Sequence, residues 1–218
     1  MSLANDSITV TPGSGATVAT HNPGDGKEYQ VVMVADPNGQ LQKSNPIYRL
    51  IVPPQAVGAN KVHADLFNAT GTGKVMRILS AFCFVNLDTA VTGTVGLRIS
   101  LTRTTSVGTG GTAATNEGTS VTAPAISRLD TSSAALPSGV TARASPTGGA
   151  TAGALLATRY MFTEETNAGS AVAAALGCEF VRNSGAELIV RENEGIRFVQ
   201  GSVASVGTIG FEVTFELV

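Results

Sequence analysis

The strongest constraint on the fold of this chain is the alternation of apolar and polar side chains along short segments. The closing stretch sets Phe211, Val213, Phe215 and Leu217 against Glu212, Thr214 and Glu216. Because successive side chains of a β-strand point to opposite faces, this period of two predicts a strand with one buried face.

Similar apolar patterns recur along much of the chain, and none has the spacing of an amphipathic helix. Within residues 74–85 we expect Met76, Ile78, Phe82 and Phe84 to share one face, with Ala81 and Cys83 on the other. Further strands are expected at residues 29–35, 47–52, 95–101, 155–162, 187–191 and 195–200.

Turn residues separate these segments. Gly71-Thr-Gly73 precedes a long strand, and Asn193-Glu-Gly195 predicts a tight hairpin between two strands. Many strands with turns between them, and no alternation of strands with helices, predict an all-β fold. We expect an antiparallel β-sandwich or a jelly-roll-like domain.

The N-terminal quarter of the chain reads as a separate region. Residues 1–55 form a β segment interrupted by Gly and Pro, which is available for interactions and ends near Pro53-Pro54. Consecutive prolines favour an extended linker. We therefore expect a boundary near residue 56 and a main β-sandwich domain over residues 56–218.

Residues 104–153 interrupt the strand pattern with about fifty residues of mostly Gly, Thr, Ser, Ala and Pro. Structureless loops longer than about 15 residues are uncommon in compact domains. Leu129 and Leu136 are nearly the only large aliphatic residues between Val121 and Gly153, too few for a separate core. We expect an extended arm that becomes ordered only against a neighbouring subunit, with a disordered loop as the alternative.

The fraction of charged residues is low compared with that of typical soluble domains. Charged residues make up 14% of the chain, against about 25% in typical domains. Such a surface lacks the mixed charge that keeps proteins apart, so it suits a chain covered by neighbours. With a net charge of −2 and no basic stripe, nucleic-acid binding is not expected.

Location and cysteine chemistry follow from simpler features. No apolar run approaches the roughly 18 residues of a membrane span, and Met1–Asp6 does not resemble a signal peptide. We expect a soluble protein made in the cytoplasm. Cys83 and Cys178 each lie in an apolar run, which predicts buried free thiols and leaves a disulfide open.

The one phosphate-loop candidate is Gly71-Thr-Gly-Lys74. A phosphate loop needs a glycine where Asn68 stands and a Ser or Thr where Val75 stands. The segment also precedes a strand and not a helix, so no helix N-terminus would face a phosphate. We interpret it as a hairpin turn.

Histidines are too few for a convincing metal or nucleophile site. His63 and Asp65 would lie on one face of a strand, but two ligands make a weak metal site, and a surface histidine beside an aspartate is the expected outcome. His21 falls in a turn. A Ser-His-Asp arrangement stays open, although no Gly-x-Ser-x-Gly elbow accompanies these residues.

The acidic clusters, Glu164-Glu165 and Glu192 with Glu194, do not resemble a glycosidase pair. Adjacent acids in a strand point to opposite faces, and acids beside a turn are normally solvated. We therefore expect no catalytic, cofactor-binding or metal-binding residues, and no enzymatic activity.

Several stretches resemble structural proteins of tailed bacteriophages. They are Ile8–Thr20, Gly26–Asp36, Leu66–Ile78, Arg103–Thr112, Glu194–Arg197 and Phe211–Phe215. The resemblance implies a component of the virion, namely a capsid decoration (cement) protein, and such proteins are β-rich and often trimeric. It supplies no functional residues.

If the resemblance holds, the protein is made in the host cytoplasm and becomes part of the virion. Its partners are the major capsid protein or other virion proteins, and further copies of itself, with a trimer favoured. The alternative is a tail-fibre, head-fibre or other receptor-binding module. Low charge and an aromatic content of 5% favour the lattice role.

Overall fold

The computed structural model describes residues 45–85, 95–149, 152–163, 177–181, 187–204 and 206–218, and the backbone of two short N-terminal strands. The chain divides into two compact units, Met1–Ser44 and Asn45–Val218. In the first unit, β1 (Ala19–His21) pairs antiparallel with β2 (Tyr29–Val31). Residues 32–35 of the strand expected there lie outside the described part.

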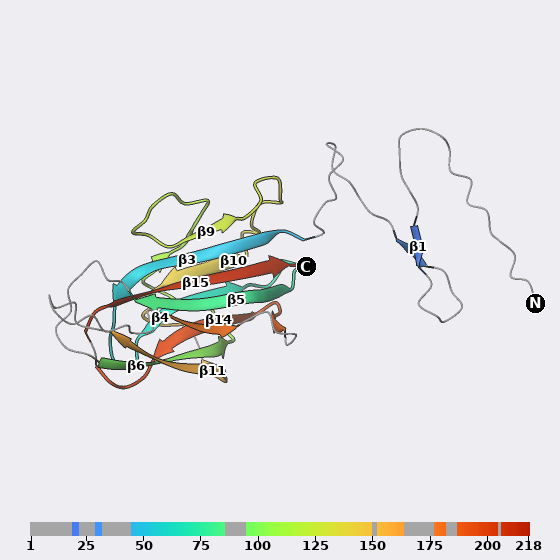
Figure 1. The fold of residues 1–218 in the computed structure, drawn as a ribbon. Coiled ribbons are helices and arrows are strands. Elements are labelled where there is room, and N and C mark those ends of the chain that lie inside the picture. The colour runs from blue at the N-terminus through green and yellow to red at the C-terminus, as the bar shows by residue number, and fades with distance from the viewer. Residues whose placement is uncertain are drawn as a thin grey trace, which may run out of the picture. The chain divides into compact units, whose positions relative to one another are not determined.

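The second unit consists of two β-sheets, and the described residues contain no helix (Figure 1). One sheet has the order β11–β6–β14–β4–β10–β7, and the other has the order β12–β5–β15–β3–β9–β8, with β13 also pairing with β5. The all-β sandwich prediction is therefore confirmed.

The strands of the six-stranded sheet are β4 (Val62–Asn68), β6 (Val95–Thr104), β7 (Thr112–Ala113), β10 (Val140–Ala144), β11 (Ala152–Thr163) and β14 (Glu194–Gln200). Those of the seven-stranded sheet are β3 (Ile47–Ala56), β5 (Met76–Val85), β8 (Thr115–Asn116), β9 (Ala125–Arg128), β12 (Gly177–Val181), β13 (Leu188–Val190) and β15 (Thr208–Leu217).

The longest-range strand pairs are nested within one another. β3 pairs with β15, β4 with β14, β5 with β12 and β6 with β11, all antiparallel. β15 also pairs with β5, and β14 with β6, which joins these pairs into two four-stranded halves. A chain that folds back on itself in this way, strand against strand across two sheets, has jelly-roll connectivity.

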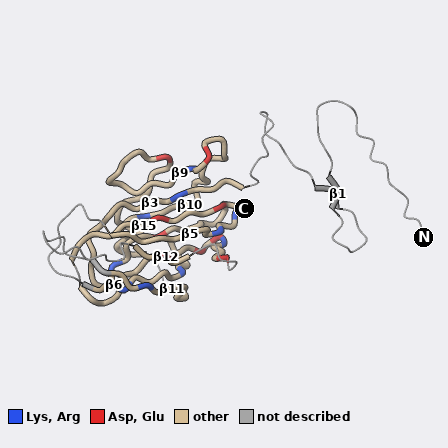
Figure 2. The backbone as a smooth tube through the Cα atoms, in the orientation of Figure 1, with Lys and Arg blue, Asp and Glu red and all other residues tan. Residues whose placement is uncertain are grey.

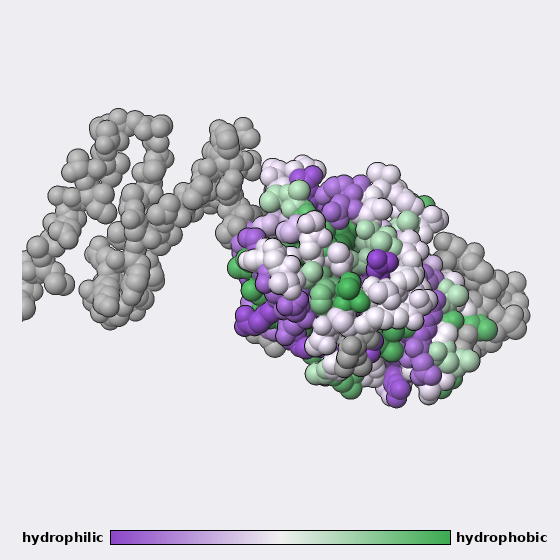
Figure 3. Space-filling view, turned by 180° about the vertical axis from the view of Figure 1, so that it is seen from behind, coloured by the Kyte–Doolittle hydropathy of each residue, from purple (hydrophilic) through white to green (hydrophobic). Residues whose placement is uncertain are grey.

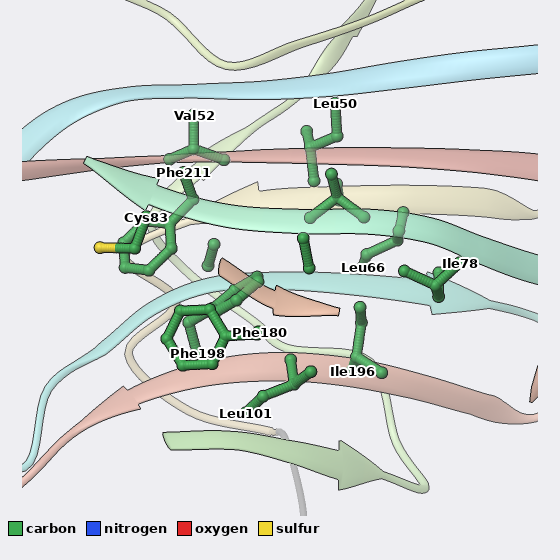
Figure 4. Packing of buried hydrophobic residues seen from close by; sticks show 14 of the residues in the cluster. Leu50, Val52, Leu66, Ile78, Cys83, Leu101, Phe180, Ile196, Phe198 and Phe211 are labelled. Carbon is green, nitrogen blue, oxygen red and sulfur yellow. The ribbon is translucent and has the colours of Figure 1, made fainter. Parts of the chain in front are cut away.

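The core lies between the two sheets and is built on the closing strand. As predicted, Phe211, Val213, Phe215 and Leu217 of β15 are all buried. Figure 4 shows Phe211 facing Phe198 of the other sheet, with ring centroids 4.6 Å apart. The Phe198 ring also meets Phe180 edge-on at 5.3 Å, so it lies between aromatic rings from β15 and β12.

The prediction for β5 is correct in its first half and wrong in its second. Met76 and Ile78 are buried, but Phe82 is 39% exposed and the buried positions continue as Ala81, Cys83 and Val85. The register with β15 shifts after Ile78, which leaves one extra residue in β5. A bulge of this kind moves every later side chain to the opposite face.

The predicted domain boundary near residue 56 is wrong. Residue 56 ends β3, a strand inside the sheet that pairs with β15 and β9, and the compact unit begins at Asn45. Pro53 and Pro54 fit because the pairing with β9 stops at Ile51 and the pairing with β15 is irregular opposite them. Proline is tolerated where the ladder needs no N–H.

The prediction of an extended arm over residues 104–153 is also wrong, because residues 104–149 are part of the subunit's own fold. β8 and β9 extend the seven-stranded sheet, while β10 and β7 extend the six-stranded one. The segment adds mainly small side chains to an existing core, so it needs few large ones: Ala125, Ile126, Val140, Ala142 and Ala144 are buried.

Two predicted hairpins are connections between sheets. Residues 191–193 join β13 to β14, which lie in different sheets, and Gly71–Gly73 lies between β4 and β5, which also lie in different sheets. Asn193, Gly71 and Gly73 have positive φ angles of 60°, 87° and 61°. The turn residues were therefore recognised correctly, but the pairing across them was not.

Truncating Phe215 should destabilise the fold strongly. Phe215 is fully buried, so we expect Phe215→Ala to lower the free energy of unfolding by about 3–5 kcal/mol. Glu212→Ala on the same strand removes only an exposed ion pair with Arg49 and should cost less than about 1 kcal/mol. Urea titration measures both, and equal effects would contradict this assignment of faces.

Residues 104–149 should be protected from hydrogen exchange in an isolated monomer. The backbone N–H groups of Ala114, Glu117 and Ser145 donate to carbonyls of Ala142, Ile126 and His63. Their exchange should therefore require sub-global or global opening. Exchange at the rate of an unfolded chain would restore the interpretation of this segment as an arm.

Candidate functional site

A polar cleft lies where the end of β10 and the loop after it meet the start of β4. Its volume is about 450 Å³, and it is lined by Asn60, Lys61, Val62, Ser145, Pro146, Thr147, Gly148 and Arg197. The loop is fixed by backbone bonds: Thr109 N–H donates to Gly148 O at 2.7 Å, and Ser145 N–H donates to His63 O at 2.8 Å. The cleft is therefore built by hydrogen-bonded backbone.

Asp65 fastens a second loop, residues 105–111 between β6 and β7, over this face. It stands on β4 between Arg143 of β10 and Arg197 of β14, its direct cross-strand partners. One carboxylate oxygen accepts the Gly108 N–H at 2.8 Å, and a Cβ at Gly108 would lie 2.0 Å from that oxygen. Burial raises the pKa of Asp65, against the lowering effect of the Gly108 N–H and of both arginines. The carboxylate is thus an anchor for the loop.

His63 lies on the opposite face from Asp65, so the prediction of one shared, exposed face is wrong. The pairing of β4 with β14 skips a residue between Val62 and Ala64, and this bulge turns His63 into the core. Its ring lies 5.6 Å from that of Phe211, and Nε2 is 3.0 Å from the Gln200 side-chain oxygen. Burial lowers the pKa of His63 to about 4, although the bond to Gln200 opposes this.

The other histidine and one acidic cluster lie outside the described side chains. His21 ends β1, where only the backbone is described, and Glu164-Glu165 lies outside the described residues. No group of three or more His, Cys, Asp and Glu side chains that could hold a metal ion occurs in the described part of the chain.

The glycine loop that resembled a phosphate loop already binds a carboxylate of the protein. The Gly73 N–H donates to the Glu192 carboxylate, and the Thr72 hydroxyl oxygen lies 3.1 Å from that carboxylate. Asn68, buried at the end of β4, donates to Lys74 O at 2.8 Å and accepts from the Thr72 hydroxyl. Glu192 therefore occupies the position that an external anion would need.

Glu194 also has structural partners. Its carboxylate accepts the Arg103 guanidinium at 3.1 Å and the Arg191 backbone N–H at 3.0 Å. Glu192 binds the glycine loop, whereas Glu194 binds Arg103 of β6. The two carboxylates therefore hold different parts of the fold and do not form a catalytic pair.

The two cysteines, far apart in sequence, lie opposite each other in the seven-stranded sheet. Cys178 of β12 is the register partner of Cys83 of β5, and both thiols are free. Cys83 is fully buried, as predicted, and Cys178 is partly buried. The composition of their surroundings predicted the burial, but nothing in the sequence spacing indicated that they meet.

A second hollow, mostly apolar, lies at the edge of the six-stranded sheet. It measures about 380 Å³ and is lined by Gly96, Arg98, Tyr160, Met161, Gly201, Ser202 and Val203. Tyr160 and Val203 are 74% and 61% exposed, and Leu155, on the same strand as Tyr160, is 64% exposed. The sequence predicted a strand at residues 155–162, but not that Leu155 and Tyr160 face solvent at a sheet edge.

Charged side chains are sparse over the surface of the main unit. In Figure 2 long stretches of the strands carry neither a blue nor a red segment. Several of the charges are paired: Arg49 meets Glu212 at 3.2 Å, and Arg77 meets Glu216 at 2.6 Å. On the face shown in Figure 3, pale surface of intermediate hydropathy lies between groups of hydrophobic (green) and hydrophilic (purple) residues.

Comparison with protein-family models found no match for the chain. Comparison with curated proteins and with solved structures found no similar protein. Within the described residues, no helix has the length and apolar character needed to cross a membrane.

The buried imidazole should make stability depend on pH. The folded pKa of His63 is about 4, below the unfolded value of about 6.5, so the unfolded state binds more protons between these pH values. Acidification from about pH 7 to pH 4 should therefore cost roughly 3 kcal/mol through this residue.

Urea titration of the wild type and of His63→Gln across this range tests the effect. The difference in the free energy of unfolding between the two proteins should shrink as the pH falls, because only the wild type loses the contribution of His63. Contributions from Asp65 and other groups are common to both proteins. A pH-independent difference would show that His63 is charged, or solvated, in the folded state.

Proposed function

We propose that this protein is a non-enzymatic structural component of a tailed-bacteriophage virion, a capsid decoration protein that binds the capsid lattice through subunit contacts. The observation that carries the proposal is the apolar, solvent-facing edge at β11. A surface of this kind gains free energy when another protein covers it.

The geometry of this edge supports a docking role. In the described sheet, β11 is the outermost strand and pairs only with β6. Tyr160 of β11 and Val203 line the apolar hollow, and Leu155 lies earlier on the same strand, opposite Thr102 of β6. All three side chains are more than half exposed. Aromatic side chains are favoured in the centres of protein interfaces, where they bury a large area at low entropic cost.

The rest of the molecule is consistent with this role. Arg49 on β3, Arg77 on β5 and Arg103 on β6 are each paired with a glutamate, which reduces the unpaired charge that would oppose close packing. The jelly roll is a fold of viral capsid domains, but also of lectins and cupins, so the fold supports the proposal without deciding it. We also expect the chain to form homo-oligomers, with a trimer favoured.

The second candidate is a receptor-binding module of a head or tail fibre, and the polar cleft favours it. Lys61, Arg197 and Thr147 could donate hydrogen bonds to a host glycan or an acidic group. Among the described residues that line the cleft, none has an aromatic side chain on which a sugar could stack, so we rank this function second.

Reattachment to particles that lack this protein tests the proposal. Labelled wild-type protein should bind such capsids saturably, whereas a Leu155→Ser, Tyr160→Ser double variant should bind at least about tenfold more weakly, because each buried side chain contributes about 1.5–3 kcal/mol. Val121→Ser is the matched control, since Val121 is 87% exposed at a different site.

Each outcome has a distinct meaning. Wild-type protein that does not bind capsids contradicts the decoration role. Binding that is unchanged in the double variant removes the β11 edge as the docking surface. Binding to host cells that is lost in Lys61→Ala and Arg197→Ala, but kept in the double variant, would support the receptor function.

A further inference from the structure

Two thiols face each other across a pair of neighbouring strands. Cys83 of β5 and Cys178 of β12 are direct register partners in an antiparallel pair. Such partners have Cα atoms about 4.5 or 5.5 Å apart, and both values lie within the roughly 4.4–6.8 Å that a disulfide spans.

We propose that Cys83 and Cys178 form a redox-active dithiol that closes to an intramolecular disulfide on reaction with a low-molecular-weight disulfide such as oxidised glutathione. The reaction is reversed by excess thiol. The proposal concerns a modification site in the fold and does not depend on the function proposed above.

The two thiols differ in their surroundings, and this assigns their roles. Cys178 is partly buried, and its pKa is lowered by the interaction with Cys83 and by the charge of Arg159, against the effect of burial. Cys83 has no exposed surface, its sulfur lies 3.4 Å from the Met161 sulfur, and its pKa is raised by the interaction with Cys178 and by burial. Since the thiolate is the nucleophile, Cys178 is the attacking thiol and Cys83 the resolving one.

The exchange proceeds in two balanced steps. The Cys178 thiolate attacks one sulfur of oxidised glutathione, its S–S bond breaks, and one glutathione thiolate leaves. The Cys83 sulfur then gives up its proton and attacks the Cys178 sulfur, which expels the second glutathione thiolate. The protein dithiol loses two electrons, the oxidant gains them, and both released protons end on glutathione.

The new bond would act at the edge of the sheet. β12 is a five-residue strand and the outermost strand of the described sheet on its side. Short edge strands open more easily than central ones. A covalent link to β5, which pairs with β15 on its other side, should therefore slow the local opening of β12.

The test uses the full-length protein, reduced, freed of reductant and equilibrated with excess oxidised glutathione. After an acid quench and alkylation, intact mass and peptide mapping should show the loss of two hydrogen atoms and a cross-link between the peptides that contain Cys83 and Cys178. Amides of Glu179 and Phe180 should then exchange more slowly than in the reduced protein, and dithiothreitol should reverse both changes.

Single variants separate the two roles. Cys83→Ser should stop at the first step and gain one glutathionyl group, whereas Cys178→Ser should stay reduced, because Cys83 is buried. Cys83→Ala serves if the serine variant does not fold. Wild-type protein that keeps two alkylatable thiols, or gains two separate glutathionyl groups, would overturn the proposal, and the same chain oxidised in denaturant controls for the oxidant.

Discussion

The contact on which the rest of this structure depends is the face-to-face packing of the two sheets around Phe198. This ring comes from β14, in the six-stranded sheet, and it lies 4.6 Å from Phe211 and 5.3 Å from Phe180 of the seven-stranded sheet. Neither sheet could bury its apolar face alone. The burial of these faces against each other is therefore what holds together strands that are far apart in the chain.

The nested pairing makes this core a property of the whole main unit. β3 and β15 come from opposite ends of the unit and pair with each other, so the sheets form only when distant segments meet. Residues 104–149 then extend both sheets at the same margin, where small buried residues such as Ala142 and Ala144 suffice. A segment with almost no large apolar side chains is ordered because others supply the core.

The alternation of apolar and polar residues predicted the buried face of a strand correctly where the strand is regular. The prediction was wrong where a bulge interrupts the strand. The buried face of β15 was predicted residue by residue, since its period of two is unbroken over Phe211–Leu217. In β5 and β4 a single extra residue reverses the face, and for this reason Phe82 is exposed and His63 is buried. Such bulges leave no sign in the alternation itself.

Several features of the candidate sites depend on which strands and loops lie side by side, and one sequence does not show this. The alternation in residues 155–162 indicates a strand, but whether Tyr160 faces a core or solvent depends on which strand lies beside it. The same holds for Cys83 and Cys178, whose meeting follows from the pairing of β5 with β12. The Glu192 carboxylate at the glycine loop is likewise set by the connection between the sheets.

The buried faces hold the main unit together, and we propose that its sparse charges and the exposed side chains at the β11 edge serve assembly on a phage capsid. The most direct test of that claim is the number of copies of this chain in purified, washed phage particles, measured by mass spectrometry with isotope-labelled peptides against the major capsid protein. A decoration protein should be present in a fixed, small-integer ratio to the capsid protein. A chain that is absent from the particles, or present in only a few copies for each, would contradict the lattice role.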